Sequence, residues 1–214
     1  MAFENYWNET HKKYSINKPT YDDWLDKYSL ILNKCKSPVL DLGCGLGNDT
    51  LYLVKKGFSV IACDYSNVAL EQVNQNIKDV KTIQLDISLP LPFEDNSFDL
   101  IIADLSLHYF DEKATINIMK EIKRILKPNG NLLARVNSTS DLNYGAGKGE
   151  KLEDNYYFVE GYNKRFFSIS DANRFFSIIG KVSVVEAEML RYTKPKKVIE
   201  VNVEKKCNKT KNNK

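Results

Sequence analysis

The stretch of sequence that decides the fold spans residues 39–50 and reads VLDLGCGLGNDT. Its first residues close an apolar run, as a strand buried on both faces of a sheet requires. Gly43, Gly45 and Gly47 follow at alternate positions, where they permit a tight turn and let a ligand approach the backbone. The residues from Asn48 onward suit a short helix, whose free N–H groups point back at the turn. The pattern predicts a strand, a glycine turn and a helix that together hold the polar end of a nucleotide-like ligand.

The spacing of the glycines separates two classes of nucleotide site. Dinucleotide sites carry G-x-G-x-x-G, in which a pyrophosphate faces a helix N-terminus. Here the spacing is G-x-G-x-G, and an acid, Asp41, precedes the turn. A carboxylate at this point repels a pyrophosphate and attracts a cationic amine. We therefore expect a ligand that contains an adenosine and a positive charge but no phosphate.

A second predicted strand, residues 58–64, also ends in a carboxylate. Asp64 lies 21 residues after Gly43, which is about the spacing at which an acid meets the ribose hydroxyls in nucleotide-binding folds. A carboxylate suits this task because it accepts hydrogen bonds from both hydroxyls. Tyr65 follows directly, where its ring is expected to lie along one face of the adenine.

The segment D-x-G-x-G-x-G, residues 41–47, resembles the cofactor motif of the class I S-adenosylmethionine-dependent methyltransferases. The resemblance implies that Asp41, Gly43, Gly45 and Asn48 line the cofactor. A third predicted strand, residues 81–86, ends in Asp86 and is followed by Ile87. By the same resemblance, Asp86 takes the adenine amino group and the backbone N–H of Ile87 meets a ring nitrogen. Asp is common where turns begin, but three consecutive strands that each end in Asp favour a cofactor site over three unrelated turns.

The fourth strand signal, residues 97–106, continues the resemblance, which places the amino-acid end of the cofactor against the backbone of Asp104 and Leu105. A helix over 112–126, N-capped by Asp111, precedes an LKPNG turn and a fifth strand, 131–137. The resemblance thus covers residues 36–137. It implies an α/β, Rossmann-like, doubly wound fold: a seven-stranded, mostly parallel sheet with an antiparallel last strand and helices on both faces.

Length and composition predict one domain, residues 1–206. The chain has 214 residues, of which 43% are hydrophobic, enough for a substantial core. The N-terminus lacks the apolar region of a signal sequence, and no window is long enough to span a bilayer, so we expect a cytoplasmic protein. The four cysteines have no paired spacing, which argues against a disulfide framework and against a metal site.

The net charge of +3 hides an asymmetry along the chain. Residues 192–214 contain eight Lys and two Glu, which leaves the rest of the chain at −3. A body of negative charge argues against a nucleic-acid groove, which needs a basic stripe. The final residues, EKKCNKTKNNK, are expected to be a disordered, basic tail, assigned to residues 207–214.

Two predicted helices, 3–14 and 21–34, form an N-terminal helical cap over residues 1–35. Such a segment resembles the one that covers the cofactor in small-molecule methyltransferases. Tyr14 is expected to contact the cofactor, because a sulfonium is attracted to an electron-rich ring face. The sequence does not decide whether Trp7 covers the cofactor or only packs against neighbouring residues.

Residues 138–166 are too long for a simple connection, and we expect them to be a substrate lid with glycine hinges. Their glycines do not make a phosphate loop, because no apolar strand leads into them and no Lys-Ser/Thr follows. Tyr144 of this segment, with His108 and Tyr109 after the fourth strand, is expected to line the substrate site. A helix over 169–179 and two strands, 182–190 and 197–204, are expected to complete the fold, the strands as an antiparallel pair.

The resemblance implies methyl transfer from S-adenosylmethionine to an acceptor by in-line displacement, with S-adenosylhomocysteine as the product. A base is needed only if the acceptor must first lose a proton, and whether His108 serves as one is open. Residues 104–107 read DLSL, without the N/D-P-P-Y/F of adenine and glutamine methyltransferases and without a cysteine for cytosine C5 chemistry. The chain is most similar to small-molecule members of the tellurite-resistance and thiopurine methyltransferase type. A protein or RNA methyltransferase and a non-catalytic S-adenosylmethionine-binding protein are the alternatives. The oligomeric state is open.

Overall fold

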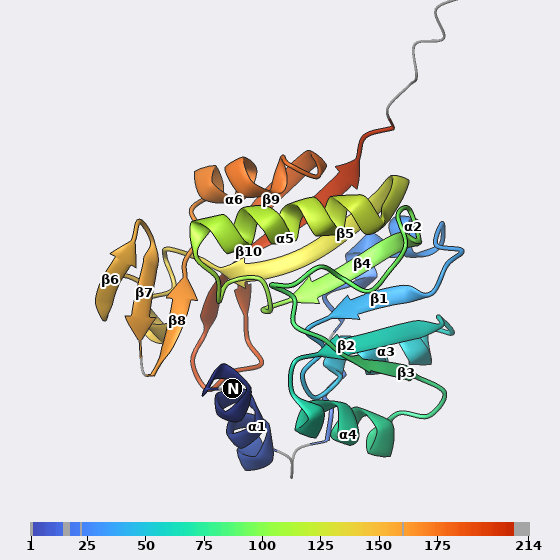
Figure 1. The fold of residues 1–214 in the computed structure, drawn as a ribbon, viewed down its shortest axis with the longest axis horizontal. Helices are drawn as coiled ribbons and strands as arrows, with labels where there is room; N and C mark the ends of the chain where they lie inside the picture. The colour runs from blue at the N-terminus through green and yellow to red at the C-terminus, as the bar shows by residue number, and fades with distance from the viewer. Residues whose placement is uncertain (1, 15–17, 22, 160, 208–214) are drawn as a thin grey trace, which may run out of the picture.

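A seven-stranded sheet forms the centre of the fold, in the order β3-β2-β1-β4-β5-β10-β9 (Figure 1). The structure, a computed structural model, describes residues 2–14, 18–21, 23–159 and 161–207, and in the first helix the side chains of 6–13. The strands are β1 (Val39–Leu42), β2 (Val60–Asp64), β3 (Lys81–Gln84), β4 (Phe98–Asp104), β5 (Leu126–Asn137), β9 (Gly180–Met189) and β10 (Lys196–Lys205). β1 to β5 run parallel, and β10 runs antiparallel to both β5 and β9. The predicted Rossmann-like fold class is confirmed.

Helices cover both faces of this sheet, as predicted. The helices are η1 (Asp26–Tyr28), α2 (Ser29–Leu32), α3 (Asn48–Lys55), α4 (Asn67–Asn76), α5 (Glu112–Ile125) and α6 (Ile169–Phe176). On one face, α5 and α6 bury residues such as Ile122 and Phe175 against β4 and β5. On the other face, Trp24 and Leu53 pack on Leu100 and Leu133, and α4 packs beside α3.

The segment before β1 differs from its prediction. In place of one helix over 21–34, the chain forms a 3₁₀ turn, η1, and one turn of α-helix, α2. The backbone N–H of Asp26 donates to the carbonyl of Asp23, and that of Tyr28 donates to the carbonyl of Leu25, which are the i to i+3 bonds of a tight turn. The indole of Trp24 is meanwhile held by a hydrogen bond to Asp49 of α3. Tertiary contacts therefore override the helical pattern here.

Two of the later helices begin at well-formed N-caps. The side chain of Asp111 accepts the N–H of Ala114 at the start of α5, as predicted. At α6 the cap is Ser168, one residue before the predicted start, and Asp171 completes a capping box with it. α6 ends at Phe176, three residues earlier than predicted.

Both strands β5 and β10 are longer than predicted. β5 begins at Leu126, because the LKPNG turn forms an irregularity within the β4–β5 pairing and Asn129 takes a left-handed conformation, φ 64°. β10 continues through Lys205, one residue past the predicted strand, and residues 208–214 of the predicted tail lie outside the described residues. Within the described ranges, no helix has the length and apolar character needed to cross a membrane.

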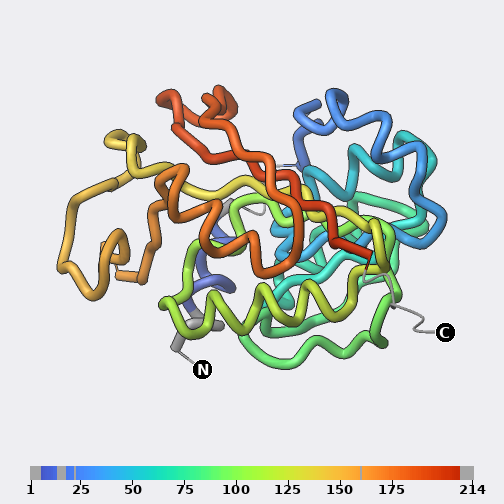
Figure 2. Tube along the Cα trace, turned by 90° about the horizontal axis from the view of Figure 1, so that it is seen from above, coloured from blue at the N-terminus to red at the C-terminus, as the bar shows by residue number. Residues whose placement is uncertain are grey.

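The carboxyl ends of β1 and β4 point toward the side of the molecule where α1 (Ala2–Tyr14) and a small second sheet lie (Figure 1). That sheet is antiparallel and consists of β6 (Glu150–Glu153), β7 (Tyr156–Val159) and β8 (Tyr162–Arg165). Together with the short turn η2 (Leu142–Tyr144), it makes up much of the segment predicted as a lid. In Figure 2 this segment and the C-terminal end of β10 lie on opposite sides of the molecule. Gly149, taken as a hinge, is packed against β7, where a Cβ would overlap the carbonyl of Phe158.

Candidate active site

The glycine turn after β1 has the backbone shape that its sequence predicts. Gly43, Gly45 and Gly47 have φ angles of 82°, 52° and 88°, a region that other residues rarely adopt. A Cβ on Gly43 would overlap the Cβ of Ser106, just beyond β4. The Ser106 hydroxyl donates to the carbonyl of Leu42 at 2.6 Å. The turn is therefore pressed against the segment after β4, and the sequence analysis missed Ser106 as the residue that fixes this contact.

Asp64, at the end of β2, reaches the glycine turn, and its contact with a ribose stays a prediction. Its Oδ2 accepts the backbone N–H of Gly45 at 2.8 Å, and its Oδ1 accepts the N–H of Ser66 at 2.9 Å. The residue is 8% exposed. Each carboxylate oxygen has two lone-pair sites, so both keep the capacity to accept a hydroxyl.

Asp41 is buried beneath the turn. Its Oδ2 accepts the hydroxyl of Thr50 at 2.5 Å. Burial raises the pKa of Asp41 to about 7, and the nearby carboxylates of Asp104 and Asp64 add to the rise. A cation placed here would therefore be strongly favoured, because it would relieve the cost of the buried negative charge.

The other predicted residues of the adenosine end differ in how they are placed. The side chain of Ile87 lies 3.5 Å from the position that a Cβ would take on Gly43, so it belongs to the turn region. The Asp86 carboxylate accepts both the N–H and the hydroxyl of Ser88, at 2.8 and 2.6 Å, and so stabilises its own turn. The carbonyl of Tyr65 accepts the side-chain amide of Gln84 at 3.0 Å.

Asn48 is engaged elsewhere. Its side-chain oxygen accepts the N–H of Thr20 at 2.7 Å, which ties the N-terminal segment to the start of α3. The side chain of Tyr14 lies outside the described residues, so the prediction for Tyr14 stays a prediction.

Asp104, at the end of β4, forms a bidentate ion pair with Arg135, at 2.7 and 2.8 Å, and also accepts Arg191 at 2.8 Å. Burial opposes its charge, but the two guanidinium groups hold the pKa of Asp104 below its usual value. The N–H of Leu105 donates to the carbonyl of Arg135, so only its carbonyl is left for a ligand. The sequence analysis missed both arginines. A charged residue inside the apolar run 131–137 was the available signal for Arg135.

Helix α1 covers the carboxyl edge of the sheet, and its side chains meet the residues of the turn. The ring of His11 lies 3.6 Å from the Cβ position of Gly45, and Asn8 accepts the hydroxyl of Ser66 at 2.7 Å. Burial lowers the pKa of His11, and Asp64 offsets part of this change. The ring of Trp7 packs edge-on against Tyr109, with 4.8 Å between the ring centroids.

Of the other predicted acceptor residues, His108 has its ring centroid 4.3 Å from that of Tyr109. His108 is 2% exposed, and burial lowers its pKa well below the usual value, with Lys196 and Lys164 adding to the change. The imidazole is therefore neutral at neutral pH. Tyr144 is fixed by its hydroxyl, which donates to the carbonyl of Lys194 at 3.0 Å.

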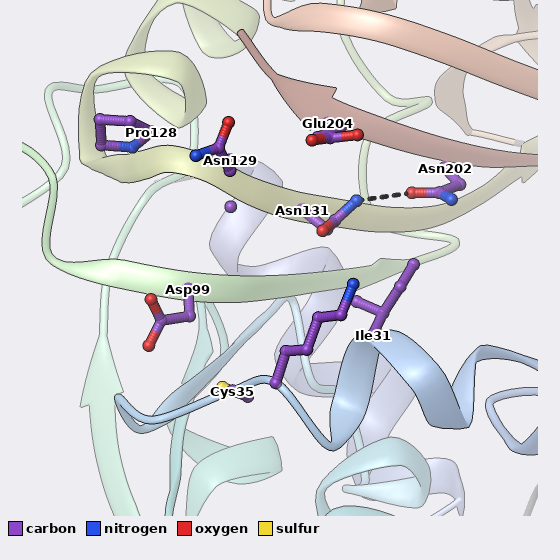
Figure 3. A pocket seen from close by; sticks show the side chains of 10 residues that line it. Ile31, Cys35, Asp99, Pro128, Asn129, Asn131, Asn202 and Glu204 are labelled. Atoms are coloured by element: carbon purple, nitrogen blue, oxygen red, sulfur yellow. Dashed lines mark hydrogen bonds between the residues drawn. The ribbon is translucent and has the colours of Figure 1, made fainter. Parts of the chain in front are cut away.

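A cavity of about 390 Å³ lies at the opposite, amino edge of the parallel strands (Figure 3). Asn131 and Asn202, which line it, bond to each other at 3.0 Å, and Asp99 accepts two backbone N–H groups and the Lys127 ammonium. Its main polar groups are already paired, and it is remote from the glycine turn.

Comparison with known proteins identifies the central part of the chain. Residues 39–130 match the family model described as a methyltransferase domain. This stretch is similar to methyltransferase domains. The match includes the glycine turn and the strand ends at Asp64 and Asp104.

Curated proteins similar to this part of the chain are named as methyltransferases. Over 92 residues the chain is 35% identical to an uncharacterized methyltransferase of Synechocystis sp., which covers 43% of this chain and 43% of that protein. It is 32% identical over 131 residues to a tRNA N(3)-methylcytidine methyltransferase of Drosophila melanogaster. That alignment covers 56% of this chain and 40% of that protein. The chain thus spans less than half the length of these two relatives. A solved S-adenosylmethionine-dependent methyltransferase of Methanosarcina mazei shares the fold, with a TM-score of 0.68 and 21% identity over 84% of this chain and 98% of that chain.

Proposed function

We propose that the protein transfers a methyl group from S-adenosylmethionine to a small-molecule acceptor by in-line displacement. The observation that carries the proposal is the hydrogen bond between the Asp64 carboxylate and the backbone N–H of Gly45. It brings the acid suited to a ribose onto the turn suited to a close backbone approach. Bound S-adenosylmethionine supplies a methyl group that its sulfonium already activates.

The residues present fit this cofactor. Asp64 would hold the ribose hydroxyls, and Ile87 would border the adenine through its backbone N–H. Asp41, whose pKa burial has raised, would stabilise a cationic group of the cofactor. The carbonyls after β4, at Asp104 and Leu105, would face the amino-acid end, on a segment that the Arg135 ion pair holds in place. The chain's own contribution is positioning and the exclusion of water.

A small acceptor is favoured by the cover over the site. Tyr6 of α1 packs on Tyr162 of β8 with 4.9 Å between ring centroids, and Trp7 packs on Tyr109. A polymer would have to displace this aromatic cover, whereas a small molecule fits beneath it. If the acceptor must lose a proton, neutral His108 is the base that we propose. The tellurite-resistance and thiopurine methyltransferase-like type is the finer assignment that the motifs favour.

An RNA methyltransferase is the second candidate, because several relatives are named as tRNA methyltransferases. Three lysines of the basic C-terminal region bear on it: Lys196 pairs with Asp141, Lys197 pairs with Glu188, and Lys205 donates to Asn96. Since two of these lysines are paired with carboxylates, the region supplies less attraction for phosphates than the sequence alone suggests.

Calorimetric titration tests the cofactor half of the proposal. We expect the protein to bind S-adenosylmethionine and S-adenosylhomocysteine and to give no heat with NAD. Binding of NAD alone would overturn the proposal. Incubation with S-adenosylmethionine that carries a labelled methyl group tests the acceptor half.

A further inference from the structure

Two buried polar side chains at the carboxyl edge of the sheet have atoms without hydrogen-bond partners. Among the residues that the structure describes, these buried side-chain atoms are Nδ1 of His108 and both Nδ2 and Oδ1 of Asn137. Asn137 is 0% exposed and His108 is 2% exposed. Folded proteins pair nearly all of their buried polar atoms, because an unpaired one lowers the free energy of unfolding. The gathering of three such atoms on two residues therefore calls for an explanation.

Asn137 lies at the edge of the sheet that carries the proposed cofactor site. It is the last residue of β5, which runs parallel to β4 and pairs with it as far as Asp104 and Arg135. Side chains alternate along a strand, so Asn137 shares a face with Arg135, two positions earlier. Arg135 forms the bidentate ion pair with Asp104. The Asn137 amide therefore lies just beyond the ion pair that holds the segment after β4.

The backbone brings His108 next to Asn137. The N–H of Arg165 donates to the carbonyl of His108 at 2.7 Å, and the N–H of Phe167 donates to the carbonyl of Asn137, also at 2.7 Å. The two carbonyls thus bond to positions only two residues apart. The ring of His108 also lies beside that of Tyr109, which belongs to the aromatic cover described above. The unpaired atoms therefore belong to the side of the proposed site on which we place the acceptor.

The groups without partners are uncharged. Burial lowers the pKa of His108 well below its usual value, so the imidazole, like the amide, is neutral at neutral pH. The ammonium of the nearby Lys196 already pairs with the Asp141 carboxylate at 2.8 Å. The Asn137 amide has both a donor, Nδ2, and an acceptor, Oδ1, to satisfy. A carboxylate would satisfy only the donor, whereas a neutral group with an N–H beside a carbonyl satisfies both.

We propose, on the basis of the proposed function, that Asn137 determines specificity for a methyl acceptor that carries an uncharged amide or lactam edge. The carbonyl of this edge accepts from Nδ2 of Asn137, and its N–H donates to Oδ1, so one group supplies both missing partners. Nδ1 of His108 makes a further hydrogen bond to the same molecule. A molecule without the edge leaves the buried amide unpaired and is rejected.

Two matched variants should change the stability of the protein in opposite directions. The unpaired Asn137 amide costs stability in the free protein, so Asn137→Leu, with the same side-chain branching, should raise the thermal midpoint by about 2–4 °C. Asn131→Leu is the control on the same strand. The Asn131 amide donates to Oδ1 of Asn202 at 3.0 Å, so its loss should lower the midpoint.

A smaller substitution guards against overpacking by Leu. Asn137→Val adds less volume to the buried site, so at least one of the two variants should show the higher midpoint. A midpoint that neither Asn137→Leu nor Asn137→Val raises would show that this amide serves the fold. That result would overturn the proposal.

Two probes of the same shape test the recognition itself. Benzamide carries the amide edge, and acetophenone has a methyl group in place of the NH₂ group. Both are titrated, with detection by NMR, into protein saturated with S-adenosylhomocysteine. We expect the wild type and Asn131→Leu to bind benzamide about tenfold more tightly than acetophenone. Asn137→Leu and Asn137→Val should bind the two probes within about twofold of each other. Equal binding of the probes by the wild type, binding of neither, or a preference that survives in both Asn137 variants would overturn the proposal.

Failure of the proposed function and failure of the Asn137 assignment give different results. If the wild type does not bind S-adenosylhomocysteine, the proposed function fails. The thermal midpoints need no ligand, so they still report whether the Asn137 amide is kept at a cost to the fold. If S-adenosylhomocysteine binds and benzamide is not preferred, the Asn137 assignment alone fails.

Discussion

The Asp64 carboxylate accepts the backbone N–H of Gly45 at 2.8 Å across a separation of 19 residues. This bond joins the end of β2 to the turn after β1. Gly45 has a φ of 52°, and its N–H is directed at the acid by the left-handed backbone. The turn is therefore held in shape before any ligand arrives, and the same carboxylate serves both the fold and the ligand.

Replacing Asp64 by Ala should weaken the binding of S-adenosylhomocysteine by more than about tenfold, or 1.4 kcal/mol, because both ribose hydroxyls lose their acceptor. Titration calorimetry measures the change. Asp95→Ala is the control, since the Asp95 side chain is 69% exposed and pairs with Arg124 away from the turn. An unchanged affinity in Asp64→Ala would refute the assignment of this residue to the ribose.

Gly43→Ala should destabilise the protein, because its Cβ would overlap Ser106 in addition to straining a φ of 82°. Gly57→Ala separates the two costs: Gly57 has a φ of 87° with nothing within 4 Å of its Cβ position. We expect Gly57→Ala to lower the free energy of unfolding by about 1 kcal/mol, from backbone strain alone. Gly43→Ala should lower it by about 2–4 kcal/mol, because the overlap with Ser106 adds to the strain. Chemical denaturation measures both free energies of unfolding, and equal losses would show that the turn is not pressed against Ser106.

Cofactor binding should release a proton between pH 5 and 7. Burial raises the pKa of Asp41 to about 7, so in the free protein the carboxyl is largely protonated below that pH. A bound cation favours the charged carboxylate and lowers the pKa, so a proton leaves and the affinity decreases as the pH falls. Calorimetry at pH 6 in buffers of different ionisation enthalpy measures the release. A heat independent of buffer would contradict this role of Asp41.

The raised pKa of Asp41 and the lowered pKa of Asp104 change the stability of the protein with pH in opposite directions. Since the folded pKa of Asp41 lies above its unfolded value, its contribution to stability is fully present below the unfolded pKa of about 3.9 and is lost as the pH rises to about 7. Asp104 has a depressed pKa, so it contributes stability above the unfolded pKa and loses it as the pH falls further. Unfolding of Asp41→Asn should therefore depend less on pH between 4 and 7 than that of the wild type. An identical pH profile would show that Asp41 does not titrate in this range.

Trp7 should report cofactor binding. It packs between Tyr109 and the ring of His11, which lies against the glycine turn. Saturation with S-adenosylhomocysteine should change tryptophan fluorescence in the wild type and in Trp24→Phe, but not in Trp7→Phe. A signal that survives in Trp7→Phe would show that α1 does not respond to the cofactor.

The sequence was sufficient to predict the central unit of the fold because its signals are local. The glycine turn, the acids that end β1 and β2 and the cap at Asp111 each depend on residues close together in the chain. The ends of β5 and β10 were harder to predict, because pairing with neighbouring strands lengthens both.

The residues missed by the sequence analysis are those whose partners lie far away in the chain. Arg191 reaches Asp104 across 87 positions, and Arg135 reaches it across 31. No spacing rule predicts such contacts: Arg135 meets Asp104 through the pairing of β4 with β5, and Arg191 lies on the connection between β9 and β10. The unpaired amide of Asn137 is likewise visible only once the fold has buried it.

The central claim is tested most directly by following the methyl group itself. The protein is incubated with S-adenosylmethionine carrying a labelled methyl group, together with either a small-molecule extract or total RNA. We predict label in the small-molecule fraction, dependent on Asp64 and absent from the RNA. Label incorporated into RNA, with none in the small-molecule fraction, would contradict the account.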